Sequence, residues 1–567
     1  MLSAARRALL PALLVVAAAV SGCSTFRAFP NQAPMAVDDD RQPFGPKPET
    51  YFSPFVWDGA DNSVFRPLSN LLAVDPAGAA INVNAVDEVP DSSWFTNRIG
   101  LGDGAITPER LAVGPCEGAP PADPAGPWTV TGGKPDGENP GFFIKMQDGS
   151  RYLLKFDGAH QAPRATAADV IVTRLYWAAG YFTPCNRVVF FDKSILHLAP
   201  DATAERSNGS EEPMTQEMVD AAFERALRLP DGRYRGNASL FIEGAPIGPW
   251  RYEGTRDDDA NDVVAHEERR ELRGASVIAS WVNHFDSREQ NTLSAWMKVD
   301  GDRGYVRHYY IDFGDCFGSL WEWDALSRRW GHSYVFDIGH ILGDFFSLGF
   351  IVRPWDRAHY GPTGETFGYF QVEPFEPDAW VNEYPNPAFG RRQEADGAWM
   401  ARILAQMTPA HVKAVVKTGE LEPAVEEELV RVLLGRRDKI LRRWFSELSP
   451  LAFPVVKKDG DGAVLCVRDL AVQAGIEPAE ARAYDALGWL GLERAETDVS
   501  VHVGPTGPCV SLPAAEKAAD DAASYVLVDV FAGGRATKRS RLRVHLYQVG
   551  RSDYRLVGLE RPDSLAD

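Results

Sequence analysis

Two short motifs in residues 281–319 constrain the fold and function of this chain more than any other feature. The first, HFDSREQN, has Asp286 as its third residue and ends at Asn291; the second, DFG, begins at Asp312. Phosphoryl transfer needs a carboxylate beside the accepting hydroxyl, and oxygen ligands that hold Mg²⁺ against the phosphates. Asp286 fits the first role, and Asn291 with Asp312 fits the second. The alternative is a buried polar turn with a structural aspartate–histidine hydrogen bond.

An amphipathic helix is expected over residues 267–283, directly before the first motif. Leu272, Ala275 and Ala279 share one apolar stripe, while charged residues crowd the first turns and are expected in solvent. Arg288, two residues after Asp286, is placed to meet a transferring phosphate, because a guanidinium fork matches phosphate oxygens. A surface arginine is the alternative.

Upstream, the sequence predicts three strands, at residues 128–130, 142–146 and 151–156. The connection between the first two is rich in glycine and contains Gly132, Gly133 and Gly137. Such a loop lets backbone N–H groups approach phosphates closely. An ordinary long hairpin explains the same pattern.

Lys155 lies in the third of these strands, among apolar residues, so it needs a charged partner or a position at the edge of a sheet. A helix is expected over residues 165–179, with Asp169 on one of its faces. The alternative is an edge strand, on which the apolar stem of Lys155 lies along the protein surface and its ammonium group reaches solvent. Residues 201–213 are polar and are expected to form a loop.

These features resemble the atypical branch of the protein-kinase-like superfamily, of which HipA-type and CotH-type kinases are members. The resemblance covers residues 128–445 and is closest over 269–314. It implies an α+β, two-lobed protein-kinase-like fold, with an N-lobe at 128–250 and a helical C-lobe at 251–449. It also implies Mg and ATP, or another nucleotide, as cofactors, and a protein, sugar or lipid acceptor.

By the same resemblance, Lys155 pairs with Asp169 to hold the nucleotide phosphates, and Gly132, Gly133 and Gly137 approach them. The chain departs from the family pattern in having no G-x-G-x-x-G, an aspartate in place of the paired glutamate, and no A-P-E after the DFG. A catalytically silent pseudokinase-like binding module and a structural envelope lipoprotein are therefore the alternatives to an active phosphotransferase.

The N-terminus has the pattern of a secretory signal. Two arginines precede the apolar residues 8–20, which are too few to span a bilayer, and small residues lead to Cys23. Small residues followed directly by cysteine resemble the lipobox of bacterial lipoproteins. By that resemblance Cys23 carries the lipid and anchors the protein in the bacterial cell envelope, at the outer membrane, on its periplasmic or surface face. A soluble secreted protein with an incidental cysteine is the alternative.

The segments that follow the signal are less regular. Residues 24–50 are expected to form a tether and 51–127 a loop-rich lead-in, because proline and glycine interrupt each short apolar run. The net charge of −20 excludes nucleic-acid binding through a basic surface. Contact with a membrane is expected through the lipid anchor alone.

Residues 450–567 are expected to form a small, mainly β, sandwich-like domain, with strands at 525–531, 540–549 and 554–559. Export permits disulfides, and five cysteines remain after Cys23. Cys466 and Cys509 both lie in this segment, and a disulfide between them would stabilise it. The sequence alone leaves the pairing of the cysteines open. Because five is odd, at least one thiol stays unpaired, and Cys316 is the candidate.

Overall fold

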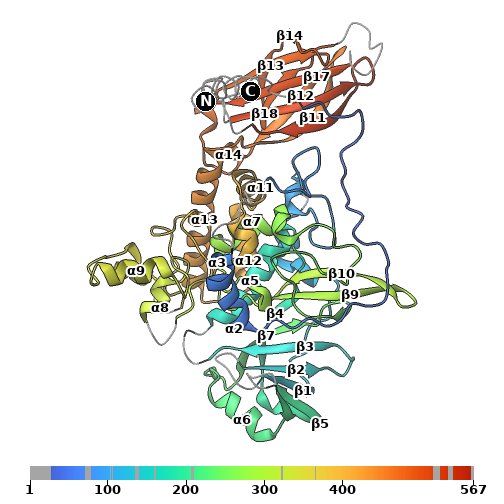
Figure 1. The fold of residues 1–567 in the computed structure, drawn as a ribbon. Helices are drawn as coiled ribbons and strands as arrows, with labels where there is room; N and C mark the ends of the chain where they lie inside the picture. Colours follow the sequence, from blue (N-terminus) through green and yellow to red (C-terminus); the bar gives the residue numbers. More distant parts are fainter. Residues whose placement is uncertain are drawn as a thin grey trace, which may run out of the picture.

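The computed structural model describes residues 27–69, 78–102, 104, 106–134, 140–158, 161, 163–205, 210–320, 324–363, 366–514, 524–533 and 540–562. The expected signal with Cys23, and Gly137, lie outside this part of the chain. Figure 1 shows one β-sheet at the bottom of the view, a group of helices in the middle and further strands at the top. The expected mixture of helices and strands is confirmed.

The largest sheet has seven strands in the order β4-β7-β3-β2-β1-β5-β6. Its strands are β1 (Trp128–Lys134), β2 (Gly141–Lys145), β3 (Arg151–Phe156), β4 (Asn186–Phe191), β5 (Leu196–Glu205), β6 (Glu211–Pro213) and β7 (Tyr234–Leu240). Lys155 on β3 pairs across to Gly141 on β2 and to Asn237 on β7. It therefore stands on a central strand, and the edge-strand interpretation of Lys155 is wrong.

The prediction of a loop is also wrong for residues 201–205 and 211–213, which lie in strands. β5 pairs in parallel with β1, and β6 pairs antiparallel with β5. Most of β5 is exposed or half-buried, so it lacks the apolar alternation by which a strand is recognised in a sequence.

Gly132 and Gly133 belong to β1 and not to the loop after it. A Cβ atom on Gly132 would lie 2.7 Å from the carbonyl oxygen of Thr203, and one on Gly133 would lie 2.2 Å from that of Gly141. Both glycines thus allow neighbouring strands to approach β1 closely. Their role is in the packing of the sheet.

Two helices cover the sheet. α5 (Arg164–Ala179) packs against β3, β4 and β7. α6 (Gln216–Glu224) begins at Thr215, whose side chain accepts a hydrogen bond from the Met218 N–H, and its Phe223 joins an aromatic core with Phe142 and Phe156. Burying these rings between the helix and the sheet fixes the sheet on which Lys155 stands.

The middle part is built around α7 (Arg270–Val282), all of whose residues are buried. The helices around it and near it are α2 (Phe55–Ala60), α3 (Arg66–Ser69), α4 (Pro108–Val113), α8 (Asp324–Arg329), α9 (Ile338–Phe346), α10 (Pro387–Gly390), α11 (Glu394–Leu404), α12 (Pro409–Lys417) and α13 (Pro423–Phe445). A short sheet lies beside them, with β8 (Ala245–Pro246), β9 (Thr292–Asp300) and β10 (Arg303–Tyr310). Among the described helices, none has the length and apolar character needed to cross a bilayer.

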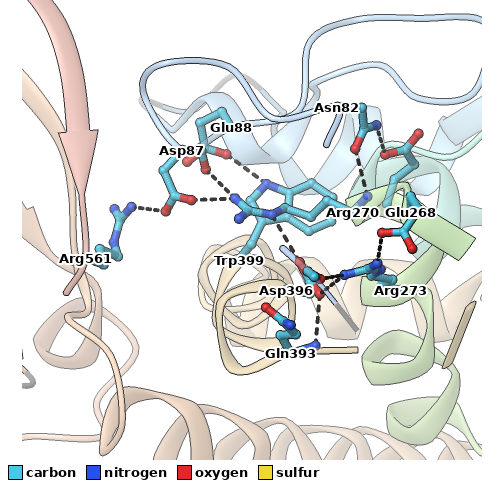
Figure 2. Close-up of polar contacts among 12 residues, drawn as sticks. Asn82, Asp87, Glu88, Glu268, Arg270, Arg273, Gln393, Asp396, Trp399 and Arg561 are labelled. Carbon is cyan, nitrogen blue, oxygen red and sulfur yellow. Dashed lines mark hydrogen bonds and ion pairs between the residues drawn. The ribbon is translucent and has the colours of Figure 1, made fainter. Parts of the chain in front are cut away.

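The prediction that the start of α7 lies in solvent is wrong, because Arg270, Glu271 and Arg273 are buried. Figure 2 shows the polar contacts that compensate this burial. Arg270 bonds to the carboxylates of Asp87 and Asp396, with 3.3 Å between its Nε and Asp396 Oδ1. Removing charged groups from water costs free energy, so such groups are buried where each one meets an opposite charge.

Asp87 is the centre of this ion cluster. Its carboxylate contacts three arginines: Arg270 on α7, Arg402 on α11 at 3.2 Å, and Arg561 near the C-terminus at 2.5 Å. Figure 2 shows Arg561 reaching Asp87 from a separate part of the chain. One carboxylate therefore joins the lead-in, the helices and the C-terminal segment.

Residues 27–50 are packed against the rest of the protein and do not form the expected tether. Phe29 is buried against Tyr525 and Tyr547, and the backbone of Phe44 exchanges hydrogen bonds with Gly304. The few apolar residues of this polar, proline-rich segment make these contacts. Their spacing is neither helical nor strand-like, so the sequence gives no sign that they are buried.

The C-terminal strands form two sheets around a shared apolar core. One contains β11 (Leu451–Asp459), β12 (Gly462–Asp469), β15 (Val501–Gly504) and β16 (Gly507–Ser511); the other contains β13 (Tyr484–Leu490), β14 (Ala495–Thr497), β17 (Tyr525–Ala532), β18 (Arg541–Gln548) and β19 (Tyr554–Glu560). The short helix α14 (Leu470–Gln473) follows β12.

The structure settles the disulfide pairing that the sequence left open: Cys466 is bonded to Cys509, and the two are paired residues of β12 and β16. A second disulfide joins Cys116 to Cys185 and attaches the lead-in to the segment before β4. Cys316 has a free, buried thiol, as predicted.

Candidate active site

A cavity of about 890 Å³ lies between the seven-stranded sheet and the loops that follow α7 and β10. Its lining includes six of the residues singled out in the sequence: Lys155, Asp169, Asp286, Arg288, Asn291 and Asp312. These come from β3, α5, the loop after α7 and the loop after β10. Gly132 and Gly133 are not among the described residues that line it, so their expected contact with phosphates is not supported.

Lys155 and Asp312 form an ion pair in this cavity, with 2.7 Å between Nζ and Oδ1. Burial alone would lower the pKa of Lys155, but the charges of Asp312 and Asp169 outweigh it and raise that pKa. Burial would raise the pKa of Asp312, and Lys155 reverses this, so that the pKa is lowered. Both groups are charged, and the Asp312 side chain is 45% exposed, so a ligand can reach it.

Asp169 is not the ion-pair partner of Lys155, although it lies near enough for its charge to act on the lysine. Its carboxylate accepts hydrogen bonds from Asn237 Nδ2 at 2.7 Å, Asn186 Nδ2 at 3.2 Å and the Phe313 N–H at 2.9 Å. Asp169 therefore holds the backbone of the loop that carries Asp312. The aspartate side chain is one methylene shorter than that of glutamate, and here both of its oxygens accept hydrogen bonds from these donors.

The Asp312 loop has a left-handed backbone at Asp312 itself, with φ of +57°. This conformation is uncommon for residues other than glycine, although aspartate adopts it more readily than most. Contacts of the two residues that follow it hold this backbone: Phe313 donates to Asp169, and Arg164 Nη1 donates to the Gly314 carbonyl at 2.6 Å. A strained residue fixed in this way is a common feature of functional sites.

Asp286 lines the cavity, and its backbone is held by hydrogen bonds at both its N–H and its carbonyl group. Its N–H donates to Asp315 Oδ2 at 2.9 Å, and its carbonyl accepts from Asn291 Nδ2 at 2.8 Å. Burial raises the pKa of Asp286 to about 7, assisted by the charges of Asp315 and Asp312 and opposed by Arg288.

Arg288 is held by protein carboxylates and is not placed as a free phosphate ligand. Its Nη1 lies 3.3 Å from Asp286 Oδ1 and also contacts Glu383, and its guanidinium stacks over Phe55 at 4.4 Å. The structure thus supports a positioning role for Arg288, which orients Asp286.

Two acidic residues of the site were not found from the sequence. Asp315 lines the cavity, and burial raises its pKa to about 7. Glu383 holds Arg288 from a distant, irregular segment. Asp315 directly follows the DFG motif, and this position could have indicated that it belongs to the site. No motif lies near Glu383 in the sequence.

His284 has a structural position beside the site. Its ring is fully buried, with Nδ1 3.1 Å from the Tyr176 hydroxyl, and burial lowers its pKa to about 3. It is therefore neutral at ordinary pH and unsuited to accept a proton from a substrate.

The lead-in also contacts the loop of residues 286–291. Glu289 accepts hydrogen bonds from Ser53 Oγ at 2.7 Å and Tyr51 Oη at 3.2 Å, and Gln290 Nε2 donates to Ser53 Oγ at 2.8 Å. The irregular residues 51–58 thus take part in building the site.

No family model and no curated protein matches this chain. Among solved structures, the chain is similar to the crystal structure of the Golgi casein kinase, with 11% identity, coverage of 57% of this chain and 76% of that one, and a TM-score of 0.23. It is also similar to that kinase with Mn/ADP bound, with 12% identity, the same coverage and a TM-score of 0.23. Such low scores do not place the chain in a family.

Proposed function

We propose that this protein is a kinase-like phosphotransferase with a two-lobed fold, and that its cavity binds a nucleotide together with Mg²⁺. The observation that carries the proposal is that Lys155, Asp286, Asn291 and Asp312, which are far apart in the sequence, line one cavity with Lys155 and Asp312 paired in their charged forms. The motif resemblance described above supports the same function.

The residues present fit a magnesium ion. Asp312 offers an accessible carboxylate, and Asn291 donates its amide nitrogen to Asp286, which leaves Oδ1 as the atom to offer a cation. Mg²⁺ prefers such oxygen ligands and, when bound, neutralises charge on the phosphates. Lys155 would contact the phosphates from the sheet side of the cavity.

Asp286 is the residue assigned to the acceptor. The acceptor hydroxyl would lose its proton to the Asp286 carboxylate as its oxygen bonds to phosphorus, and the bond from phosphorus to the leaving phosphate oxygen would break. Arg288 would keep the carboxylate in position. The acceptor is a protein, a sugar or a lipid.

We also propose that the protein is exported and attached through a lipid on Cys23 to the bacterial cell envelope. This part of the proposal rests on the sequence of residues 1–23. It is tested by mass spectrometry of the purified envelope protein, where the predicted product begins at a lipidated Cys23.

A catalytically silent nucleotide-binding module is the second candidate. The observation in its favour is that Gly132 and Gly133 belong to strand β1 and do not line the cavity, so they supply no glycine cradle for phosphates. Such a protein would bind the nucleotide as proposed but transfer nothing.

Nucleotide binding is predicted to stabilise the protein. At a concentration of 100 Kd, a nucleotide with Mg²⁺ adds about 2.7 kcal/mol to the free energy of unfolding, which a thermal-shift titration detects. Asp312→Asn removes the magnesium-dependent part of this shift, because it removes the charged ligand. The matched control Asp302→Asn, at an exposed turn, leaves the shift unchanged. No shift with any nucleotide would exclude both candidates.

A further inference from the structure

The segment of residues 335–352, which contains α9, exposes a cluster of large apolar side chains that the proposed function does not use. We call this cluster the α9 patch. Its most prominent members are Phe336, Phe345, Phe346, Leu348, Phe350 and Val352. Phe345 is 72% exposed and Phe350 85%, and no residue of α9 is buried. Figure 1 shows α8 and α9 projecting from the left of the helical part.

The exposure follows from how α9 is oriented. Ile338, Ile341, Leu342 and Phe345 have the spacing of one helical face, which an amphipathic helix normally buries. Here the apolar side is exposed, and the polar side contacts neighbouring residues of the same part of the chain: Asp344 Oδ1 accepts from Arg353 Nη1 at 2.6 Å.

Two further polar contacts lie at the start of the same helix. His340 Nδ1 lies 2.9 Å from Ser333 Oγ, and the Asp337 side chain caps the helix by accepting from the His340 N–H at 2.9 Å. The polar groups of α9 are thus satisfied within residues 333–353, while its apolar side chains remain exposed. A patch of this kind marks a surface that meets an apolar partner.

We propose that the α9 patch inserts into the interfacial region of a lipid bilayer. Phenylalanine, leucine and isoleucine on one side of a short helix, with polar groups on the other, are the side chains that enter this region. The patch includes α9, which projects from the helical part (Figure 1). Leu348 and Phe350, which follow α9, are among its most exposed side chains. A projecting apolar surface fits a deformable lipid phase.

Charge supports a lipid surface as the partner. The whole chain carries a net charge of −20, yet residues 324–363 contain four aspartates and four arginines and no lysine or glutamate. This neutral segment is repelled less than the rest of the chain by the negative surface of a bacterial membrane.

The proposed lipid on Cys23 is consistent with this contact, although the insertion does not depend on it. The chain is already packed on the protein at Phe29. The few residues from Cys23 to Phe29 span at most about 20 Å, so a lipidated Cys23 would keep the protein body close to the bilayer. The α9 patch would then be a second contact in addition to the anchor.

The test uses residues 24–567, which keep every described residue and carry neither signal nor lipid. The protein is sedimented with vesicles of phosphatidylcholine, and with vesicles of an equimolar mixture of phosphatidylcholine and phosphatidylglycerol, without nucleotide. We expect the protein to sediment with the vesicles. The double variant Phe345→Ser/Phe346→Ser should partition at least about tenfold less, because two large apolar side chains no longer enter the lipid.

The matched control is Phe52→Ser/Val503→Ser, which changes two side chains that are 72% and 71% exposed elsewhere. It should bind vesicles like the unchanged protein, and all three proteins should melt at the same temperature. Failure of the unchanged protein to bind either vesicle, or equal binding by the Phe345/Phe346 variant, would overturn the proposal. So would light scattering that shows a dimer which the Phe345/Phe346 variant dissociates, since the patch would then join two copies.

Discussion

Replacing Lys155 by methionine is expected to lower phosphoryl transfer by about a thousandfold, the effect of removing a charged group that acts on the transition state. Lys155 stands on the central strand β3 with its ammonium 2.7 Å from Asp312, so it is fixed where phosphates would lie. Asp312→Asn should cost about as much. Transfer is measured with a γ-labelled nucleotide and protein, sugar and lipid acceptors, and also as labelling of the protein itself.

The double variant Lys155→Met/Asp312→Asn should be about as slow as either single variant, because the two residues act as one unit. Lys298→Met, at an exposed position on β9, is the matched control and should retain full activity. Equal rates for the unchanged protein and both single variants would contradict the proposed roles. Nucleotide binding with no transfer by any form would favour the silent binding module.

Asp87→Asn is expected to destabilise the protein by about 3–5 kcal/mol, the range for breaking a buried ion pair by removing one partner. Three guanidinium groups, from Arg270, Arg402 and Arg561, would lose the carboxylate that they share (Figure 2). Denaturation by urea, followed by tryptophan fluorescence, measures the loss. Asp461→Asn, at a side chain that is 95% exposed, should change stability by less than about 0.5 kcal/mol.

The stability difference between the unchanged protein and Asp87→Asn is expected to depend on pH. Burial alone would raise the pKa of Asp87, but the three arginines outweigh it and hold the pKa well below its usual value. A carboxyl group of this kind stabilises the fold above its ordinary pKa of about 4, and this contribution is lost as the pH falls through the folded-state value. The stability difference between the unchanged protein and Asp87→Asn should therefore be largest near neutral pH and shrink in acid. A difference that does not change with pH would contradict the account.

Residues of the candidate site could be predicted where they belong to a short motif or stand out from their neighbours in the sequence. Asp286, Asn291 and Asp312 share two compact motifs, and Lys155 interrupts an apolar strand where a buried ammonium needs a partner. The structure places all four in one cavity. The partner of Lys155 was predicted to be Asp169 and is Asp312. Asn186 and Asn237 donate hydrogen bonds to Asp169, and the sequence does not show that these distant residues meet that carboxylate.

Contacts between irregular segments could not be predicted. Glu383 and Ser53 reach the site from regions without helical or strand periodicity, and Phe29 and Phe44 attach a segment whose composition indicates a tether. The prediction that the start of α7 lies in solvent was wrong because its charged residues are buried. A run of charged residues usually marks solvent, and only the distant Asp87 and Asp396 make burial of Arg270 possible.

The most direct test of the central claim is a crystal structure of the protein with Mg²⁺ and a non-hydrolysable nucleotide analogue. We predict that the phosphates lie against Lys155, that the metal is bound by Asp312 and Asn291, and that Asp286 faces the terminal phosphate. A nucleotide bound elsewhere, or a cavity that remains free of nucleotide at saturating concentration, would contradict the proposed function.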